Sequence, residues 1–198
     1  MIRNYHKRYA AFDSNFLSVT MDKKKGKIAY IGIDSGGRDR DRHATYNLLL
    51  PGKAGVFGAF AKKAPSKVEI GESSVLFGND EGDSANIEFL DKKSFKIDFT
   101  GSNKANLLTL DFSIKIAPPT VWSDSVVKKH HKKLKSRNPL CAYKSEYSLP
   151  LTVHFPDFGL IKIEASSPDV YCVEELLKSK DYDGLGLGYA NYGSHTYF

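Results

Sequence analysis

The sequence has few of the features that point directly to a function. No run of about 18 apolar residues occurs in the 198-residue chain, so no segment is expected to cross a membrane as a helix. The first residues, MIRNYHKRYAAF, are basic and aromatic and lack the continuous apolar segment of a secretory signal. The chain is therefore expected in the cytoplasm, with no membrane partner.

Cysteine is scarce, with only Cys141 and Cys172 in the chain. Without an export signal, free thiols are expected here rather than a disulfide. The two cysteines have no metal-ligand spacing, and His130 and His131 are adjacent, so in a regular element they cannot both bind one ion. We therefore expect no metal and no cofactor.

Motifs of nucleophilic or metal-dependent hydrolysis are missing: the sequence has no G-x-S-x-G, H-E-x-x-H or C-x-x-C. Gly184, Gly186 and Gly188 suggest a phosphate-binding loop at first sight. The strand, helix and later acid that a dinucleotide-binding fingerprint requires are not there, so a glycine-rich strand or loop is the better interpretation.

Glycoside chemistry needs two carboxyl groups that lie close together in space, which a sequence does not reveal. Four acids occur near the aromatic end of the chain: Asp157, Glu164, Asp181 and Asp183. We interpret them as surface acids in turns and assign none of them a catalytic role. Whether the chain is an enzyme stays open, and its catalytic residues are unknown.

The sequence is instead rich in alternating apolar and polar residues, most clearly in residues 15–34, NFLSVTMDKKKGKIAYIGID. Leu17, Val19 and Met21 share one face before a turn that carries five charges around Gly26, and the alternation resumes after the turn. Glycine readily adopts the positive φ that a bulged hairpin loop requires. This segment is therefore predicted to be a β-hairpin.

Short alternating runs separated by turn-like segments continue along the chain. They predict strands at residues 45–50, 67–70, 74–77, 86–90, 94–100, 107–117, 147–155 and 160–164. In the 107–117 run, one face is apolar and is predicted to line the core: Leu108, Leu110, Phe112, Ile114 and Ile116. About ten strands without long helices between them predict an all-β fold, an antiparallel two-sheet β-sandwich with one or two short helices, in a single domain over residues 1–198.

Four segments are harder to interpret. Residues 2–12 suit an edge strand or an arm over the sheet, and residues 55–61 suit a close backbone approach better than a regular element. Residues 121–137 suit either a helix or a basic loop. Residues 167–180 begin with Ser-Pro-Asp, which is typical of a helix start, although a strand at residues 170–173 is the alternative.

One basic run, residues 128–137 (KKHHKKLKSR), has six basic residues and no acid, which accounts for the net charge of +6. It resembles a polyanion-binding patch. Aromatic residues do not interleave with it as they do in single-strand binders, so a solvated loop or a partner-contacting arm is the alternative. The patch consists of Lys128, Lys129, Lys132, Lys133, Lys135 and Arg137.

The end of the chain, residues 181–198, combines aromatic rings with planar hydrogen-bonding groups and glycines. Such a combination suits sugar rings, which are apolar on their faces and polar at their rims. The candidate ligand-binding residues are Tyr182, Tyr189, Asn191, Tyr192, His195 and Tyr197. The alternative is that these rings fill the core or an interface.

The opening stretch, LSVTMDKKKGKIAYIGIDSGGR, resembles the first hairpin of the mutarotase-like β-supersandwich domains of carbohydrate-active enzymes. The shared pattern is a strand, a turn with an acid and a glycine (Asp22 and Gly26), and a second strand from Ile28. The resemblance covers about a tenth of the chain and transfers no catalytic residue. It implies a sandwich that accompanies a glycoside hydrolase-like catalytic domain.

Two functional hypotheses follow. The first is a carbohydrate-associated sandwich that binds a glycan or braces a glycoside hydrolase-like catalytic domain or subunit; the apolar last residues would suit the N-terminal domain of a longer polypeptide. The second is a basic interaction module that binds nucleic acid or an acidic protein through residues 128–137. Heparin retention with a steep salt dependence would favour the second hypothesis.

Overall fold

The computed structural model describes most of the first half of the chain and separate segments of the second half. For most residues after 106 it describes the backbone alone. The described residues are 1–4, 6–34, 36–37, 47–49, 55–101, 107–113, 120–123, 141–148, 150–155, 158–164, 170–178 and 183–191.

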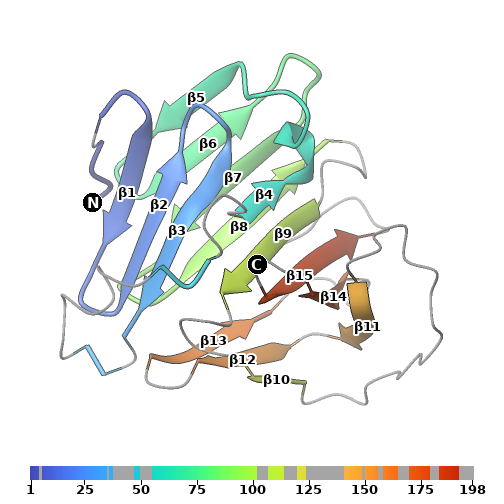
Figure 1. Cartoon of the computed structure of the whole chain (residues 1–198). Helices are drawn as coiled ribbons and strands as arrows, with labels where there is room; N and C mark the ends of the chain where they lie inside the picture. Colours follow the sequence, from blue (N-terminus) through green and yellow to red (C-terminus); the bar gives the residue numbers. More distant parts are fainter. Residues whose placement is uncertain are drawn as a thin grey trace.

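The described chain is built from β-strands in three antiparallel sheets (Figure 1). The largest sheet has, in spatial order, β1 (Tyr9–Asp13), β2 (Leu17–Asp22), β3 (Lys27–Ile33), β4 (Gly55–Phe57), β9 (Leu107–Ser113), β15 (Asp183–Asn191), β14 (Val170–Lys178) and β11 (Cys141–Ser148). The second sheet has β5 (Lys67–Ile70), β6 (Ser74–Gly78), β7 (Ser84–Phe89) and β8 (Phe95–Thr100). The third has β10 (Thr120–Ser123), β12 (Leu151–Phe155) and β13 (Gly159–Ile163). The predicted all-β antiparallel sandwich is thus confirmed, and the described helical structure is one 3₁₀ turn, Gly58–Phe60.

The opening hairpin is formed by β2 and β3, as the alternation predicts. Leu17, Val19 and Met21 are buried on the core face, with 5%, 0% and 0% of their surface exposed. Thr20 pairs with Tyr30 and Met21 pairs with Ile28, so β3 contains one extra residue at a β-bulge. A bulge changes the phase of the alternation, which explains how β3 keeps apolar residues on the core face on both sides of it.

The turn of this hairpin is held by Asp22, whose side chain is only 1% exposed. Its carboxylate accepts hydrogen bonds from the backbone N–H groups of Lys24 and Lys25 and from Nε and one terminal nitrogen of Arg8. Burial alone would raise the pKa of Asp22, but the hydrogen bonds from Arg8 and from the turn outweigh it and lower that pKa. Gly26 has a φ of 58°, which confirms the expected left-handed position.

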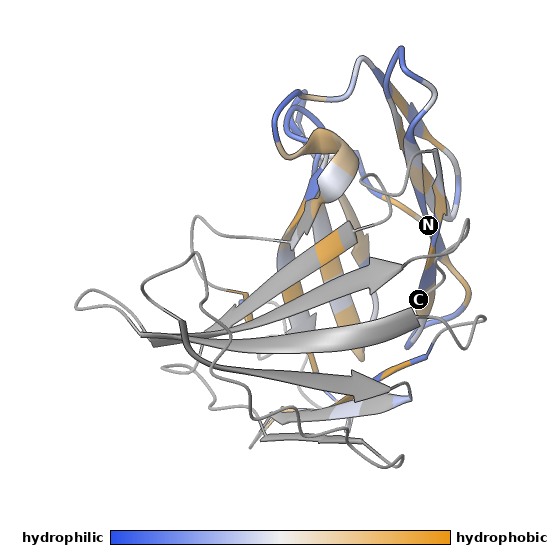
Figure 2. Ribbon diagram, turned by 90° about the vertical axis from the view of Figure 1, so that its right-hand side faces the viewer, coloured by the Kyte–Doolittle hydropathy of each residue, from blue (hydrophilic) through white to orange (hydrophobic). Residues whose placement is uncertain are grey.

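The four-stranded sheet packs its apolar face against the large sheet. Phe12 on β1 stacks on Phe89 of β7 with ring centroids 4.1 Å apart, and Phe57 on β4 lies 5.8 Å from Phe99 of β8. Along the strands of both layers, apolar residues alternate with polar ones (Figure 2). The core therefore lies between the two layers, and it includes Leu108 of β9, which is 1% exposed. The other residues predicted for that core face have side chains outside the described set.

The carboxyl-terminal strands correct one interpretation and confirm another. Residues 170–178 form β14 and not the predicted helix, because the segment pairs with β15 on one side and with β11 on the other. The glycine-rich segment is β15, an inner strand between β9 and β14. Strand pairing on both sides satisfies backbone groups that a helix start at Ser167 would satisfy only locally.

Other element boundaries also differ from the predictions. Residues 55–60 form β4 and the 3₁₀ turn, and residues 47–49 form no strand, although the Leu48 N–H donates to the Ile31 carbonyl. The predicted 147–155 strand is divided into β11 and β12 around Pro150, which has no N–H to donate to a ladder. The amino-terminal segment is an edge strand, β1, and its outer side pairs at Ala11 with Arg3.

Candidate functional site

The predicted aromatic site is described only in part. Tyr189 and Asn191 lie on β15, where the backbone of Tyr189 pairs with Leu108 and Cys172 and that of Asn191 pairs with Val170. The remaining members of the predicted site lie outside the described residues: Tyr182, Tyr192, His195 and Tyr197. Whether these rings form one surface stays a prediction.

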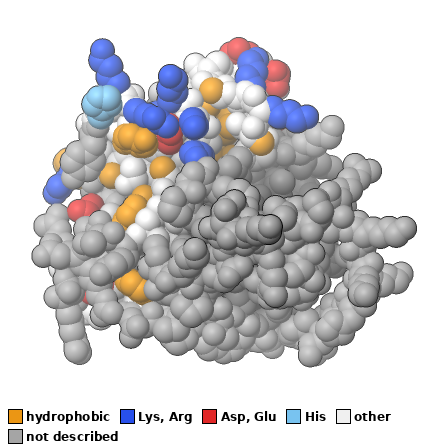
Figure 3. All heavy atoms as spheres, in the orientation of Figure 1, with side chains coloured by type: hydrophobic (Ala, Val, Ile, Leu, Met, Phe, Trp, Pro, Cys, Tyr) orange, Lys and Arg blue, Asp and Glu red, His pale blue; other side chains and the backbone are white. Residues whose placement is uncertain are grey.

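The predicted basic patch also lies outside the described residues, because it falls within residues 124–140. The described part of the chain has a different group of basic side chains around the β2–β3 turn, at the upper end of the molecule in Figure 3. Lys7, Lys24 and Lys25 are exposed there, and Lys23 Nζ donates to the carbonyl of His6. Arg8 belongs to the same end, but its charge is paired with Asp22.

The structure does not describe a close pair among the four acids considered for glycoside chemistry. Glu164 is exposed and forms an ion pair with Lys162 Nζ, and Asp183 begins β15. Asp157 and Asp181 lie outside the described residues. No catalytic residue is assigned from these positions.

The described side chains do form one polar hollow, on the outer face of the four-stranded sheet. It has a volume of about 530 Å³. Its floor is a row of register partners that crosses all four strands: Glu69, Leu76, Asn86 and Asp98. This face is opposite to the core face, because Val75, Phe77, Ile87 and Ile97, which alternate with the row, are all buried.

Two hydroxyl-bearing edges flank this row. Ser84 of β7 pairs with Thr100 of β8 on one side, and Ser74 of β6 pairs with Glu88 of β7 on the other. Ser74, Ser84 and Thr100 all line the hollow. The hollow thus presents hydroxyl, amide and carboxylate groups around the aliphatic side chain of Leu76, with Ile70 at its border.

Asp98 is the carboxylate that β8 contributes to the hollow. Its side chain is 28% exposed, and Oδ2 lies 3.4 Å from Lys96 Nζ, which in turn lies 2.8 Å from Glu88. The hydrogen bond to Glu88 and the charge of Asp98 raise the pKa of Lys96, so this lysine stays charged. Asp98 Oδ1 is buried without a hydrogen-bond partner in the structure, so this carboxylate keeps one acceptor atom unused.

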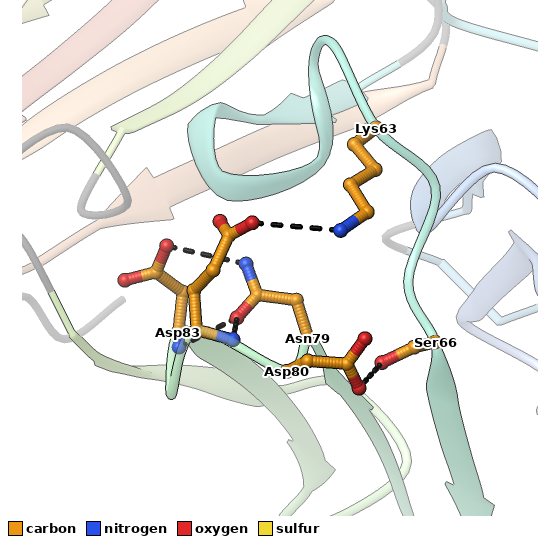
Figure 4. Close-up of polar contacts among 6 residues, drawn as sticks. Lys63, Ser66, Asn79, Asp80 and Asp83 are labelled. Atoms are coloured by element: carbon orange, nitrogen blue, oxygen red, sulfur yellow. Dashed lines mark hydrogen bonds and ion pairs between the residues drawn. The ribbon is translucent and has the colours of Figure 1, made fainter.

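The β6–β7 turn, which leads into Ser84 of the hollow, is held by side-chain hydrogen bonds (Figure 4). Asn79 Oδ1 accepts the backbone N–H groups of Glu81 and Asp83 at 3.0 and 2.9 Å, and Asn79 Nδ2 donates to Asp83. Ser66 donates to Asp80 at 2.7 Å, which ties the start of β5 to the same turn. These bonds fix the hairpin register, and the register in turn aligns the row across the sheet.

Comparisons with protein-family models, with curated proteins and with solved structures give no match. Across the described ranges, no group of three or more His, Cys, Asp or Glu side chains is arranged to hold a metal ion. The same ranges contain no helix long and apolar enough to cross a bilayer.

Sequence reasoning located the strands of this site but missed its polar row. The alternation in residues 67–70, 74–77, 86–90 and 94–100 already places polar residues on one face of each strand. The alignment of Leu76, Asn86 and Asp98 depends on register, which depends on the bonds of the turns. The polar face of each strand could therefore be predicted from the sequence. The alignment of these faces across the sheet could not.

Proposed function

We propose that this chain is a non-catalytic, carbohydrate-associated β-sandwich domain, and that the outer face of β5–β8 holds the glycan. The observation that carries the proposal is the row of planar polar groups around Leu76. Amide and carboxylate groups present neighbouring atoms that match adjacent sugar hydroxyls, and an aliphatic side chain between them suits the apolar face of a sugar ring.

Electrostatics support a neutral ligand in this hollow. The two lysines beside it are already paired, Lys96 with Glu88 and Asp98 and Lys67 with Glu69, so they offer little to an external anion. The face has an aliphatic residue where an aromatic ring would stack more strongly, so single-site binding is expected in the range of about 1 mM. The resemblance of the opening hairpin to supersandwich domains agrees with this assignment.

The test is a titration of the ¹⁵N-labelled protein with neutral β- and α-linked oligosaccharides at high salt, followed by amide shifts. Binding should move the amides of Leu76, Asn86 and Asp98. Asn86→Ala and Asp98→Ala should each weaken binding by more than about fivefold and leave the fold intact, because both side chains lie on the outer face. Lys62→Ala is the matched control, since Lys62 is exposed and does not line the hollow.

The same titration separates this site from the aromatic end of the chain. The combined change Tyr189→Ala and Tyr192→Ala should leave binding on the β5–β8 face unchanged. Loss of binding in that variant, with normal binding in Asn86→Ala, would move the glycan site to the end of the chain. No binding of any oligosaccharide would contradict the glycan-binding proposal itself.

A polyanion-binding module is the second candidate, because basic side chains gather around the β2–β3 turn (Figure 3). Lys7, Lys24 and Lys25 are exposed there, and the described part has no acid among them except Asp22, which is paired with Arg8. Retention on heparin that falls steeply with salt, and that falls further in Lys24→Gln with Lys25→Gln, would support this function. Retention unchanged by the two substitutions would assign it to residues outside this turn.

A further inference from the structure

A second cavity differs from the polar hollow in position and in chemistry. It has a volume of about 410 Å³ and lies between β2, β3 and β9 of the large sheet, β8 of the second sheet and β13 of the third. Its wall is aliphatic and consists mainly of Leu17, Ile28, Ile31, Ile97, Leu108 and Ile163. Each of these six residues is at most 7% exposed.

The mouth of this cavity is charged. Lys93, Lys162 and Glu164 line it together with the exposed side chain of Leu160. Lys162 is neutralised by Glu164. Lys93 Nζ instead lies 4.1 Å from the ring centroid of Phe16 and forms no ion pair with a described carboxylate.

The combination of an aliphatic wall and a lysine at the mouth that forms no ion pair with a described carboxylate selects a class of ligand. We propose that this cavity binds a straight-chain fatty acid, with the alkyl chain inside and the carboxylate at Lys93. The volume is within the range of about 300 to 1,000 Å³ that small-molecule sites occupy. One aromatic ring, Phe95, lines the cavity, so flexible methylene chains suit the wall better than flat aromatic ligands.

Sugars do not suit this cavity, because the described residues of its inner wall are aliphatic and cannot replace the hydrogen bonds of sugar hydroxyl groups. The fatty-acid site is therefore independent of the glycan proposal. It involves a different face of β8, since Ile97 lines the cavity and its neighbour Asp98 lines the polar hollow.

The first measurement is calorimetric titration of the intact chain with octanoate, decanoate and dodecanoate, all below their micelle concentrations. Each buried methylene contributes enough transfer free energy to tighten binding about threefold to fourfold. We therefore expect the affinity to rise about threefold to fourfold for each methylene added between octanoate and dodecanoate, with one ligand bound per chain. Absence of binding, or binding that does not depend on chain length, would overturn the proposal.

The second measurement tests the head group. Lys93→Gln should weaken dodecanoate binding by about fivefold or more and leave dodecanol binding unchanged, because only the carboxylate uses the charge. Lys92→Gln is the matched control, since Lys92 is the exposed neighbour that does not line the cavity. Equal losses in Lys93→Gln and Lys92→Gln would overturn the assignment of the carboxylate to Lys93.

A third variant tests the cavity itself. Ile161→Trp adds volume at a partly buried wall position and should abolish binding of both dodecanoate and dodecanol. Full binding by a folded Ile161→Trp protein would contradict the site, and the Lys93 measurement decides the matter if this variant does not fold. Asn86→Ala should bind dodecanoate normally, so failure of the glycan proposal and failure of this one give different results.

Discussion

Two hairpin turns of this protein have similar local chemistry and different surroundings. In the β2–β3 turn, Asp22 accepts two backbone N–H groups and Gly26 has a φ of 58°. In the β6–β7 turn, Asn79 accepts two backbone N–H groups and Gly82 has a φ of 86°. Each turn thus uses a side-chain acceptor at its start and a left-handed glycine near its end.

The surroundings of the two turns differ in packing and in charge. A β-carbon on Gly26 would lie 2.9 Å from Cδ of Pro65 and 3.0 Å from Cγ of Phe60, whereas one on Gly82 would meet no atom within 4 Å. Asp22 is buried and charged, and Asn79 is neutral and partly exposed. We therefore expect the same turn chemistry to contribute different amounts of stability, depending on what packs against it.

The largest expected effect is at the two glycines. Gly26→Ala should lower the free energy of unfolding by about 3 kcal/mol, because a left-handed alanine costs about 1 kcal/mol and the crowding by Pro65 and Phe60 adds about 2. Gly82→Ala carries only the backbone cost, about 1 kcal/mol. Urea denaturation of both variants measures the difference. Equal losses would mean that the crowding around Gly26 relaxes at no cost.

The next effect is at the two side-chain acceptors. Asp22→Ala should cost about 2 kcal/mol, because it leaves two N–H groups of the turn without their buried acceptor and removes the partner of the partly exposed Arg8 side chain. Asn79→Ala should cost about 1 kcal/mol, since water reaches the exposed turn. Thermal unfolding followed by circular dichroism compares them. A larger loss for Asn79→Ala would reverse the ranking of the two turns.

Low pH should affect the stability of the two turns differently, because the Asp22 carboxylate can be protonated and the Asn79 amide does not titrate. The pKa of Asp22 is lowered in the folded protein, so its contribution to stability is fully present above the unfolded value of about 3.9 and is lost as the pH falls through the folded value. The stability difference between the protein and Asp22→Asn should therefore shrink as the pH falls below about 4. Asn79→Ala should show a difference that does not change over that range.

The smallest expected effect is at the ion pair beside the second turn. Lys63 Nζ lies 3.5 Å from Glu81, and the two side chains are 64% and 66% exposed. Lys63→Ala should change the free energy of unfolding by less than about 0.5 kcal/mol, because water screens such a pair. A loss above about 1 kcal/mol, in the same urea measurement, would show that this turn is more tightly held than its exposure suggests.

Part of the fold could be predicted because it depends on short-range pattern. The β2–β3 hairpin and β5–β8 follow from period-two alternation and from turn residues such as Gly26, all within a few positions along the chain. The candidate site could be predicted less well. Its polar residues lie in predicted strands, but their alignment into one row is a property of the sheet and not of any single strand.

The incorrect helix prediction for residues 167–180 has a physical cause. Residues 167–180 contain a local helix-start signal worth about 1 kcal/mol, whereas β14 gains backbone hydrogen bonds along two neighbouring strands. These neighbours, β11 and β15, are far apart from each other in the sequence and adjacent to β14 in space. Pairing on both sides, with the hairpin partner β15 and with the more distant β11, therefore outweighs a weak local preference.

The sequence by itself determined the all-β class, the faces of the strands in its first half and the left-handed turn at Gly26, because alternation and turn chemistry act over a few residues. Only the tertiary structure decided that β15 lies inside the large sheet, that Asp22 is buried against Arg8, and that Leu76, Asn86 and Asp98 form one row. Those features depend on which distant segments pair and in which register. The free energy of that choice comes from burial and backbone pairing summed over the whole chain.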